Sequence, residues 1–594
     1  MDQNIPVKGG EFLVRETQPE SIFIPEEFDE EQKMIGQTCQ DFLDTEVFPN
    51  LDRIDAQEEG LMRDLLTKTG ELGLLAISVP EEYGGFDQSF ITAMYACEVL
   101  GAGYSYAVAY SCHTGIGTLP ILYYGTDEQK QKYVPKLATG ELIGAYCLTE
   151  PGAGSDANAG TASATLSEDG KYYILNGQKM WITNGGFADI FTVFAKIDND
   201  RVQSAFIVER ILPGLTFNPE EKKMGIKGSS TRQIFFNDCL VPVENLLGKR
   251  GEGFRIALNI LHMGRIKLGA NVVGAAKKSI DYSVRYANER KQFNCLISSF
   301  GAIKYKLAEQ VIRTFVTESA VYRASKDLDE AIEFYVGNGE DKGRDTMNAF
   351  NQFAIESAAV KVFASEMLDY VVDEALQIYG GMGFSSEMPV DRAYRDSRIN
   401  RIFEGTNEIN RIIVVDTVLK RAAKKEIPLM IEAQKELDKL PGLKAEDNKE
   451  SDFFETKKSY VRNFKKVALI LLKSVSDKFT RTLVNEQEIL NNISDIIMLL
   501  YLAESALLRI QKLEKIKGAE SVKIYSDILD VFVYDAASSI RKLGMDAVNS
   551  FAYGDIKDML IRGIDYYTRV EGVNVRDARR RIADLLISEN RYCF

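Results

Sequence analysis

The sequence predicts a mainly helical α+β protein in which an antiparallel β domain separates two helical regions and a further helical block ends the chain. Apolar residues recur at a spacing near 3.6 before about residue 143 and after about residue 253, which is typical of amphipathic helices. Short β-rich runs such as IFTVFAKI and SAFIVER lie between these regions. We therefore expect an N-terminal extension (1–25), an N-terminal helical domain (26–143), a β domain (144–252), a helical bundle domain (253–425), a linker (426–452) and a C-terminal helical domain (453–594).

The N-terminal helical domain is predicted from three amphipathic segments punctuated by glycines, at 31–48, 61–73 and 89–101. Thr126 is expected to begin another helix, because a hydroxyl at the N-cap accepts a hydrogen bond from the first free backbone N–H groups.

The β domain is predicted from runs that include YYILNG and KMWITNG. Asn176 with Gly177 and Asn184 with Gly185 are expected to separate strands, because Asn-Gly pairs favour tight turns. The sheet is expected to be mostly antiparallel.

Long amphipathic runs predict the helical bundle domain, with breaks at 292–299 and at the glycine-rich segment 379–384. The linker is predicted from Pro428 and from LPGLKAEDNKESD at 440–452. The segment 457–473 is basic and amphipathic, which is typical of a membrane-surface helix, but we expect it to pack on the catalytic core. In the C-terminal block an apolar stripe is formed by Ile493, Ile496, Ile497, Leu500, Ala503 and Leu507.

Composition excludes several classes of protein. About 45% of the 594 residues are apolar, which excludes a disordered chain, and no apolar run approaches the roughly 20 residues that span a bilayer. The 72 basic and 87 acidic residues give a net charge of −15, which argues against nucleic-acid binding. Seven scattered cysteines without a CxxC pair indicate reduced thiols in a cytoplasmic protein and no zinc or other metal site.

The chain has only two histidines, His113 and His262, so catalysis by a Ser-His or Cys-His pair has few candidates. No Walker A, HExxH or GxGxxG motif is present. Acid–base chemistry is therefore expected to fall to carboxylates, Lys or Tyr.

Two motifs lie in the β domain. YCLTEPGAGSD at 146–156 could bring backbone N–H groups around a phosphate, although an ordinary loop is the simpler interpretation of this motif alone. Trp181, the single tryptophan, and Thr183 are expected to share one face of a strand, where they could cover a flavin. A packing role is the alternative for Trp181.

Three motifs lie in the helical bundle domain. NERKQF at 288–293 contains Arg290, which could bind a phosphate or belong to a solvated charge run. QIYGGMGF at 377–384 is either a helix end or a close backbone approach to a ligand. In RINRIFEGTNEINR at 398–411, Glu404 lies among apolar residues, which raise the pKa of a carboxyl group toward that of a base near neutral pH. A helix-capping role is the alternative for Glu404.

The five motifs, in this order and spacing, resemble the acyl-CoA dehydrogenase family over about residues 26 to 423. KMGIKGSST at 223–231 and the pair Gly264-Arg265 are also similar to it, and the block beyond about 430 resembles that of the very-long-chain subgroup. Asn294 departs from a glycine common in the family. His262 stands where several members carry an acidic residue that contacts the adenosine of CoA.

The resemblance implies a site for FAD and an acyl-CoA thioester. Glu404 matches the catalytic base, and the position that carries the base in another subgroup is Gly264 here. Substrate contacts are implied for Ser155, Arg265 and Gly405. Cofactor contacts, some of them from a neighbouring subunit, are implied for Tyr146, Leu148, Thr149, Gly154, Ser155, Trp181, Ile182, Thr183, Arg290, Gln292, Phe293, Gln377, Gly380, Gly381, Thr406 and Glu408.

The implied reaction is α,β-dehydrogenation of an acyl-CoA to the trans-2-enoyl-CoA of fatty acid β-oxidation. The implied electron acceptor is electron-transfer flavoprotein, and the implied assembly is a homodimer, with a tetramer as the alternative. Two other functions stay open at this point: an acyl-CoA oxidase of the same fold, and a non-catalytic assembly or nucleic-acid-binding protein of that fold.

Overall fold

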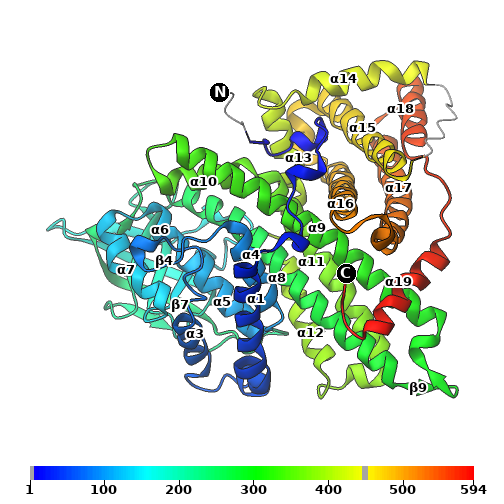
Figure 1. Ribbon diagram of the computed structural model, residues 1–594. Coiled ribbons are helices and arrows are strands. Elements are labelled where there is room, and N and C mark those ends of the chain that lie inside the picture. Colours follow the sequence, from blue (N-terminus) through cyan, green and yellow to red (C-terminus); the bar gives the residue numbers. More distant parts are fainter. Residues whose placement is uncertain (1–5, 444–451) are drawn as a thin grey trace.

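Three long helices form the centre of the molecule (Figure 1). The structure is a computed structural model that describes residues 6–443 and 452–594. The three helices are α8 (Gly253–Glu289), α9 (Gly301–Asn338) and α11 (Ala354–Tyr379). α8 packs against both α9 and α11. The N-terminal helices and the sheet lie on one side of these helices, and the C-terminal helices lie on the other. The predicted mainly helical α+β fold is confirmed.

The N-terminal region is helical, as predicted. Its longer helices are α1 (Glu30–Phe42), α3 (Leu61–Glu71), α4 (Phe90–Gly101), α5 (Ser105–Cys112), α6 (Leu119–Tyr124) and α7 (Asp127–Thr139). The helix predicted at 31–48 ends as an α-helix at Phe42 and continues as a π-helical segment, Leu43–Val47. The predicted N-cap is confirmed, because the Thr126 hydroxyl accepts a hydrogen bond from the backbone N–H of Gln129 at 3.3 Å.

Glycines bring α4 and α8 into close contact. A Cβ on Gly101 would lie 2.1 Å from the carbonyl oxygen of Asn271, and a Cβ on Gly274 would lie 1.7 Å from that of Glu98. Such a side chain would force the two helices apart. This contact fixes the wall on which the candidate site is built.

One sheet of eight strands follows the N-terminal helices, in the order β6-β7-β3-β2-β4-β5-β8, with β1 paired to β4. Only the β1–β4 and β2–β4 pairs are parallel, so the predicted mostly antiparallel sheet is confirmed. The strands are β1 (Gly144–Cys147), β2 (Ser163–Leu166), β3 (Tyr172–Thr183), β4 (Ile190–Ile197), β5 (Ser204–Glu209), β6 (Leu215–Phe217), β7 (Thr231–Pro242) and β8 (Leu246–Leu247).

Strand β3 corrects one prediction and confirms another. Asn176 and Gly177 do not separate two strands; they lie inside β3, where the pairing with β7 shifts register. Because a β-bulge can absorb the Asn-Gly pair, the chain continues without a turn. Asn184 and Gly185 follow the end of β3, as expected.

The predicted breaks in the helical bundle are confirmed. After α8 the chain forms a two-stranded hairpin, β9 (Lys291–Gln292) and β10 (Cys295–Leu296). After α11 it forms a 3-10 segment, Gly380–Phe384. Three more helices complete the bundle: α10 (Lys342–Gln352), α12 (Pro389–Ser397) and α13 (Asn407–Ala423).

The linker prediction for 426–452 is wrong over most of its described part, because α14 (Leu429–Lys439) occupies it and packs against α15. Residues 444–451 of the predicted linker lie outside the described residues. A buried apolar face explains why this segment is helical rather than extended, since Leu429 and Ala433 are fully buried. The remaining C-terminal helices are α15 (Phe453–Phe479), α16 (Gln487–Lys517), α17 (Lys523–Phe551), α18 (Gly554–Tyr567) and α19 (Val575–Glu589).

Contacts bind the C-terminal helices to the rest of the chain. The predicted stripe on α16 is buried, and α16 packs against α9 and α13. The basic segment 457–473 belongs to α15, which packs against α14, α16, α17 and α18. It therefore packs mainly on the other C-terminal helices, and not on the catalytic core as expected. In the N-terminal segment, Gly10 donates its N–H to Glu356 at 2.7 Å, and the carbonyl of Ile22 accepts a hydrogen bond from Lys512 at 2.6 Å. Among the described residues no helix combines the length and apolar character needed to traverse a bilayer.

Candidate active site

A cavity of about 150 Å³ lies between α5, α8, α11 and the segment that leads into α13. Most of its wall is apolar, and Glu404 lines it together with Phe403 and Gly264. Thr183, at the end of β3, also lines this cavity. The structure therefore brings the end of the sheet and the segment around Glu404 to one cavity.

The backbone around Glu404 adopts an uncommon conformation. Glu404 has φ 58° and Gly405 has φ 82°, so two consecutive residues lie in the left-handed region. Helix α13 then begins, and the Thr406 hydroxyl accepts a hydrogen bond from the N–H of Ile409 at 3.3 Å as its N-cap. Glycine tolerates this turn without cost, whereas the surroundings must hold Glu404 in it.

Side chains from α8 and α13 hold this turn by its carbonyl groups. The Asn410 amide donates to the carbonyl oxygen of Gly405 at 2.7 Å and to that of Thr406 at 3.0 Å. Arg265 donates through Nε to the carbonyl oxygen of Glu404 at 3.2 Å. Among the described residues, no acceptor pairs with the backbone N–H of Glu404.

Burial raises the pKa of Glu404 to about 7, although Arg265 and Lys361 nearby favour the ionised form. Within the described chain its Oε2 atom is buried and has no hydrogen-bond partner. A Cβ on Gly264 would lie 3.0 Å from this atom, so glycine at this position leaves room for the carboxyl group. The raised pKa expected from the apolar setting is confirmed, and it suits a base that accepts a proton near neutral pH.

Burial also shifts the pKa values of three basic side chains near Glu404. Burial lowers the pKa of Arg265 to about 10, and its Nη1 contacts Nδ1 of His262 at 3.2 Å. Burial, with Arg265 next to it, lowers the pKa of His262 to about 3, so this histidine is neutral. Lys361 on α11 is fully buried, and burial lowers the pKa of its amine to about 7. Sequence reasoning missed Lys361; the available signal was a lone lysine within the apolar run AAVKVFA.

On the sheet side, Tyr146 and Leu148 are buried, and the Tyr146 hydroxyl has no partner among the described residues. The carbonyl of Thr149 accepts a hydrogen bond from the N–H of Met180 at 2.9 Å. Gly154 and Ser155 lie exposed in the loop that follows. This loop is held by Glu150, whose buried carboxylate pairs with Lys179 at 2.6 Å, a pair that sequence reasoning also missed.

Trp181 corrects a prediction. It does not line the cavity with Thr183; its side chain is 52% exposed and its φ is 60°. A register shift between β3 and β7 lies at this point, and such a bulge breaks the simple alternation of faces along a strand. Ile182, by contrast, is buried.

The remaining candidate residues lie on the surface, away from the cavity in a single chain. Two groups of them lie at neighbouring helix ends, since the rings of Tyr286 on α8 and Tyr379 on α11 stack with centroids 4.0 Å apart. Phe293 and Phe384, next to these ends, are each 89% exposed. Glu408, on α13, is exposed as well. The other exposed candidates are Arg290, Gln292, Gln377, Gly380 and Gly381.

Four family models match the chain. They are the acyl-CoA dehydrogenase N-terminal domain at 29–141, the middle domain at 145–239, and two described as acyl-CoA dehydrogenase C-terminal domains, at 251–419 and 463–565. Together they cover most of the chain.

Individual proteins agree with the family models. The chain is 43% identical over 585 residues to a probable acyl-CoA dehydrogenase of Bacillus subtilis, covering 98% of each chain. It is 37% identical over 508 residues to the very long-chain specific acyl-CoA dehydrogenase of Homo sapiens, covering 81% of this chain and 74% of that one. A crystal structure of an acyl-CoA dehydrogenase from Bacillus anthracis complexed with FAD superposes with a TM-score of 0.96 at 43% identity, over 99% of this chain and 100% of that one.

Replacing Glu404 by Gln should stabilise the protein at alkaline pH. Because burial raises the pKa of Glu404 from 4.5 to about 7, ionising it between these values costs folding free energy. The variant should therefore match the wild type below about pH 4, where the carboxyl group is protonated in both states, and should exceed it above pH 7, by about 3 kcal/mol at most. Thermal unfolding midpoints at the two pH values measure this.

Glu408→Gln is the matched control, because this carboxyl group is exposed on α13 and its pKa is lowered rather than raised. The Glu408→Gln variant should show no increase in its thermal unfolding midpoint over the wild type at high pH. An equal gain for both variants would mean that the burial of Glu404 is not the cause.

Proposed function

The chain belongs to the acyl-CoA dehydrogenase family, and on that premise we propose that it binds FAD and oxidises acyl-CoA thioesters to trans-2-enoyl-CoA. The observation that carries the proposal is the carboxyl group of Glu404, which lines an apolar cavity and whose buried Oε2 has no partner among the described residues. This chemistry needs such a group, because the α-carbon of a thioester is a weak acid and its proton needs a base outside bulk water.

The residues present fit FAD. The Tyr146 hydroxyl is buried without a partner, and Thr183 faces the same cavity as Glu404. A Cβ on Gly152 or Gly154 would meet no atom within 4 Å, so the loop after β1 leaves open space for a bulky ligand. Tyr146, Leu148, Thr149, Ser155 and the end of β3 would hold the cofactor. FAD, when bound, supplies the acceptor for the hydride from the β-carbon.

In this mechanism Glu404 takes the proton from the α-carbon, and the β-hydrogen leaves with its electron pair. The product is the enoyl thioester, with the proton on the Glu404 carboxyl group. Negative charge develops on the thioester oxygen. The backbone N–H of Glu404, which has no acceptor among the described residues, is suited to donate a hydrogen bond to this oxygen. Arg265 keeps this turn in place through the Glu404 carbonyl.

The shape of the cavity supports a long acyl chain as the substrate. Its α8 wall runs from Gly264 to Ser279, which at 1.5 Å per residue is roughly 22 Å. C–C bonds of about 1.5 Å follow a zigzag, so each advances an extended acyl chain by less than its own length, and more than roughly 15 bonds are needed to span the wall. The wall is formed on α8 by Gly264, Lys267, Leu268, Asn271, Val272, Ala275, Lys278 and Ser279.

We further propose that electron-transfer flavoprotein reoxidises the flavin and that a second copy of this chain covers the exposed helix ends beside Phe293 and Phe384. Two side chains of this size that are 89% exposed are typical of an interaction surface. Arg290 and Gln377 in that surface would then reach the neighbouring copy's cofactor. Hydrogen peroxide formed in proportion to enoyl-CoA would instead assign the protein as an acyl-CoA oxidase.

Glu404→Gln should retain flavin and lose its reduction by acyl-CoA, by about 10²- to 10⁴-fold, because the amide cannot accept the α-proton. Anaerobic stopped-flow absorbance measures the bleaching. Asp416→Asn, at an exposed position of α13 that no predicted cofactor or substrate contact involves, should bleach at the wild-type rate. Normal bleaching in Glu404→Gln would remove Glu404 from its role.

An acyl-CoA series should show affinity rising with chain length. Each methylene buried contributes about 0.8 kcal/mol, or roughly a fourfold gain in affinity, until the channel is filled. Ala275→Phe narrows the cavity beside the far part of the α8 wall. It should lower the affinity for long-chain acyl-CoA and leave the affinity for short-chain acyl-CoA unchanged. Anaerobic titration of the flavin absorbance gives these affinities. A series without length dependence would contradict the channel.

Phe293→Asp should dissociate the assembly and lower its flavin content, because a charge would be buried between copies. Sedimentation and the flavin-to-protein absorbance ratio measure both effects. Ile556→Asp on α18, an equally apolar and 62% exposed position, is the control. Unchanged mass in Phe293→Asp would exclude this surface as the interface.

A further inference from the structure

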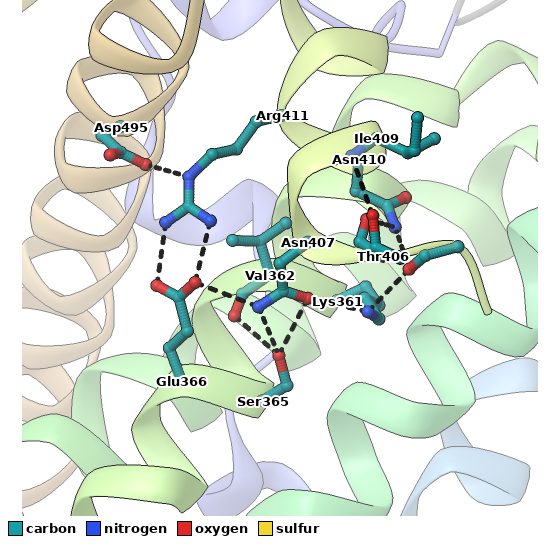
Figure 2. A network of polar contacts seen from close by, with 11 residues as sticks. Lys361, Val362, Ser365, Glu366, Thr406, Asn407, Ile409, Asn410, Arg411 and Asp495 are labelled. Carbon is teal, nitrogen blue, oxygen red and sulfur yellow. Dashed lines mark hydrogen bonds and ion pairs between the residues drawn. The ribbon is translucent and has the colours of Figure 1, made fainter. Parts of the chain in front are cut away.

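A polar chain joins the C-terminal helices to the turn that carries Glu404 (Figure 2). We infer that Asp495 on α16 is a positioning residue for Glu404, acting through Arg411, Glu366, Asn407 and Lys361. The inference rests on the proposed function, because it gives the C-terminal helical domain a part in that same reaction.

The first link crosses from the C-terminal domain to the core. Arg411 on α13 donates through Nε to Asp495 at 2.7 Å and through both Nη atoms to the carboxylate of Glu366 on α11, at 2.8 and 2.9 Å. These bonds use three of the five N–H donors of the guanidinium group, so two carboxylates fix its plane at once. Asp495 therefore helps to set the position of Glu366.

The second link passes through the amide of Asn407. Its Nδ2 donates to Glu366 at 3.0 Å and to the Ser365 hydroxyl at 3.1 Å, and its Oδ1 accepts from Lys361 at 2.7 Å (Figure 2). A carboxylate can only accept hydrogen bonds, so Glu366 faces Nδ2 of the amide and leaves Oδ1 to face the Lys361 amine. A shift of Glu366 would thus be transmitted to Lys361.

The third link reaches the turn. The Lys361 amine donates to the carbonyl oxygen of Gly405 at 2.7 Å. Glu404, which precedes Gly405, has a positive φ, a conformation that a residue other than glycine keeps only while its surroundings hold it. Lys361 is fully buried, so these acceptors replace water for its amine, and its charge favours the ionised form of Glu404. Loss of this polar chain of contacts should let the turn relax and should displace the carboxyl group of Glu404.

Asp495→Asn tests the far end of the chain with little change in shape. We expect flavin reduction by acyl-CoA to slow by about 3- to 30-fold, with flavin content unchanged. Asp584→Asn is the matched control, because Asp584 on α19 also pairs a C-terminal carboxylate with a core cation, Lys304, but lies off the chain. The control should stay within about twofold of the wild type. A wild-type rate in Asp495→Asn would overturn the inference.

A double-mutant cycle separates positioning from simple stabilisation. Once Lys361→Met has broken the last link, Asp495→Asn should cost little more, so the two effects should be clearly less than additive. Full additivity would show that Asp495 does not act through Lys361 and would overturn the inference.

Two readouts need no turnover. Hydrogen exchange in the full-length protein should be faster over 398–411 in Asp495→Asn than in Asp584→Asn, and equal protection would overturn the inference. If acyl-CoA fails to reduce even the wild-type flavin, the proposed function fails, but this exchange comparison still decides whether the chain holds the turn.

The second readout is the pKa of the Glu404 carboxyl group, measured by infrared difference titration with Glu404→Gln as the blank. Lys361→Met should raise this pKa, because a nearby positive charge is lost. The other titratable groups that face Glu404, namely Arg265, Tyr146 and Cys112, stay in place. An unchanged pKa would remove Lys361 from the chain and overturn the inference.

Discussion

The site depends on the burial of one carboxyl group that the protein does not pair. Oε2 of Glu404 has no hydrogen-bond partner in the described chain, and the space beside it exists because residue 264 has no side chain. Burying such a group costs free energy. That cost raises its pKa to about 7, and the same property makes it a base at neutral pH. At this position the protein loses some folding free energy and gains a carboxyl group that can accept a proton near neutral pH.

The rest of the architecture keeps that carboxyl group in place. Gly101 and Gly274 let α4 and α8 approach closely, which fixes a wall of the cavity that Glu404 lines. Arg265 and Asn410 bind the carbonyl groups of a turn whose backbone is otherwise unfavourable. Lys361 binds the same turn from α11, and its own network extends to Asp495 in the C-terminal domain. The helical extension is thus connected to the reaction centre by hydrogen bonds, not only by apolar packing.

Predictions from local sequence patterns were wrong where tertiary packing determined the local structure. Asn176 with Gly177 has the composition of a turn, but pairing on both sides of β3 keeps the chain extended and absorbs the pair in a bulge. A similar irregularity separates Trp181 from the cavity that Thr183 lines. The segment 429–439 is rich in charged residues, but its few apolar residues lie on one buried face, and this burial stabilises a helix.

The sequence by itself determined the order of helical and β regions, because periodicity encodes it. It also offered Glu404 as the candidate base, because apolar residues surround it and because its motif resembles that of the acyl-CoA dehydrogenase family. Only the tertiary structure revealed that Lys361 meets Gly405, 44 residues away, and that Arg411 meets Asp495, 84 residues away. It also decided that Gly264 lies against the carboxyl group and that Trp181 is exposed. The physical reason is that burial, and the pKa that follows from it, arise from contacts between distant segments, which no local pattern specifies.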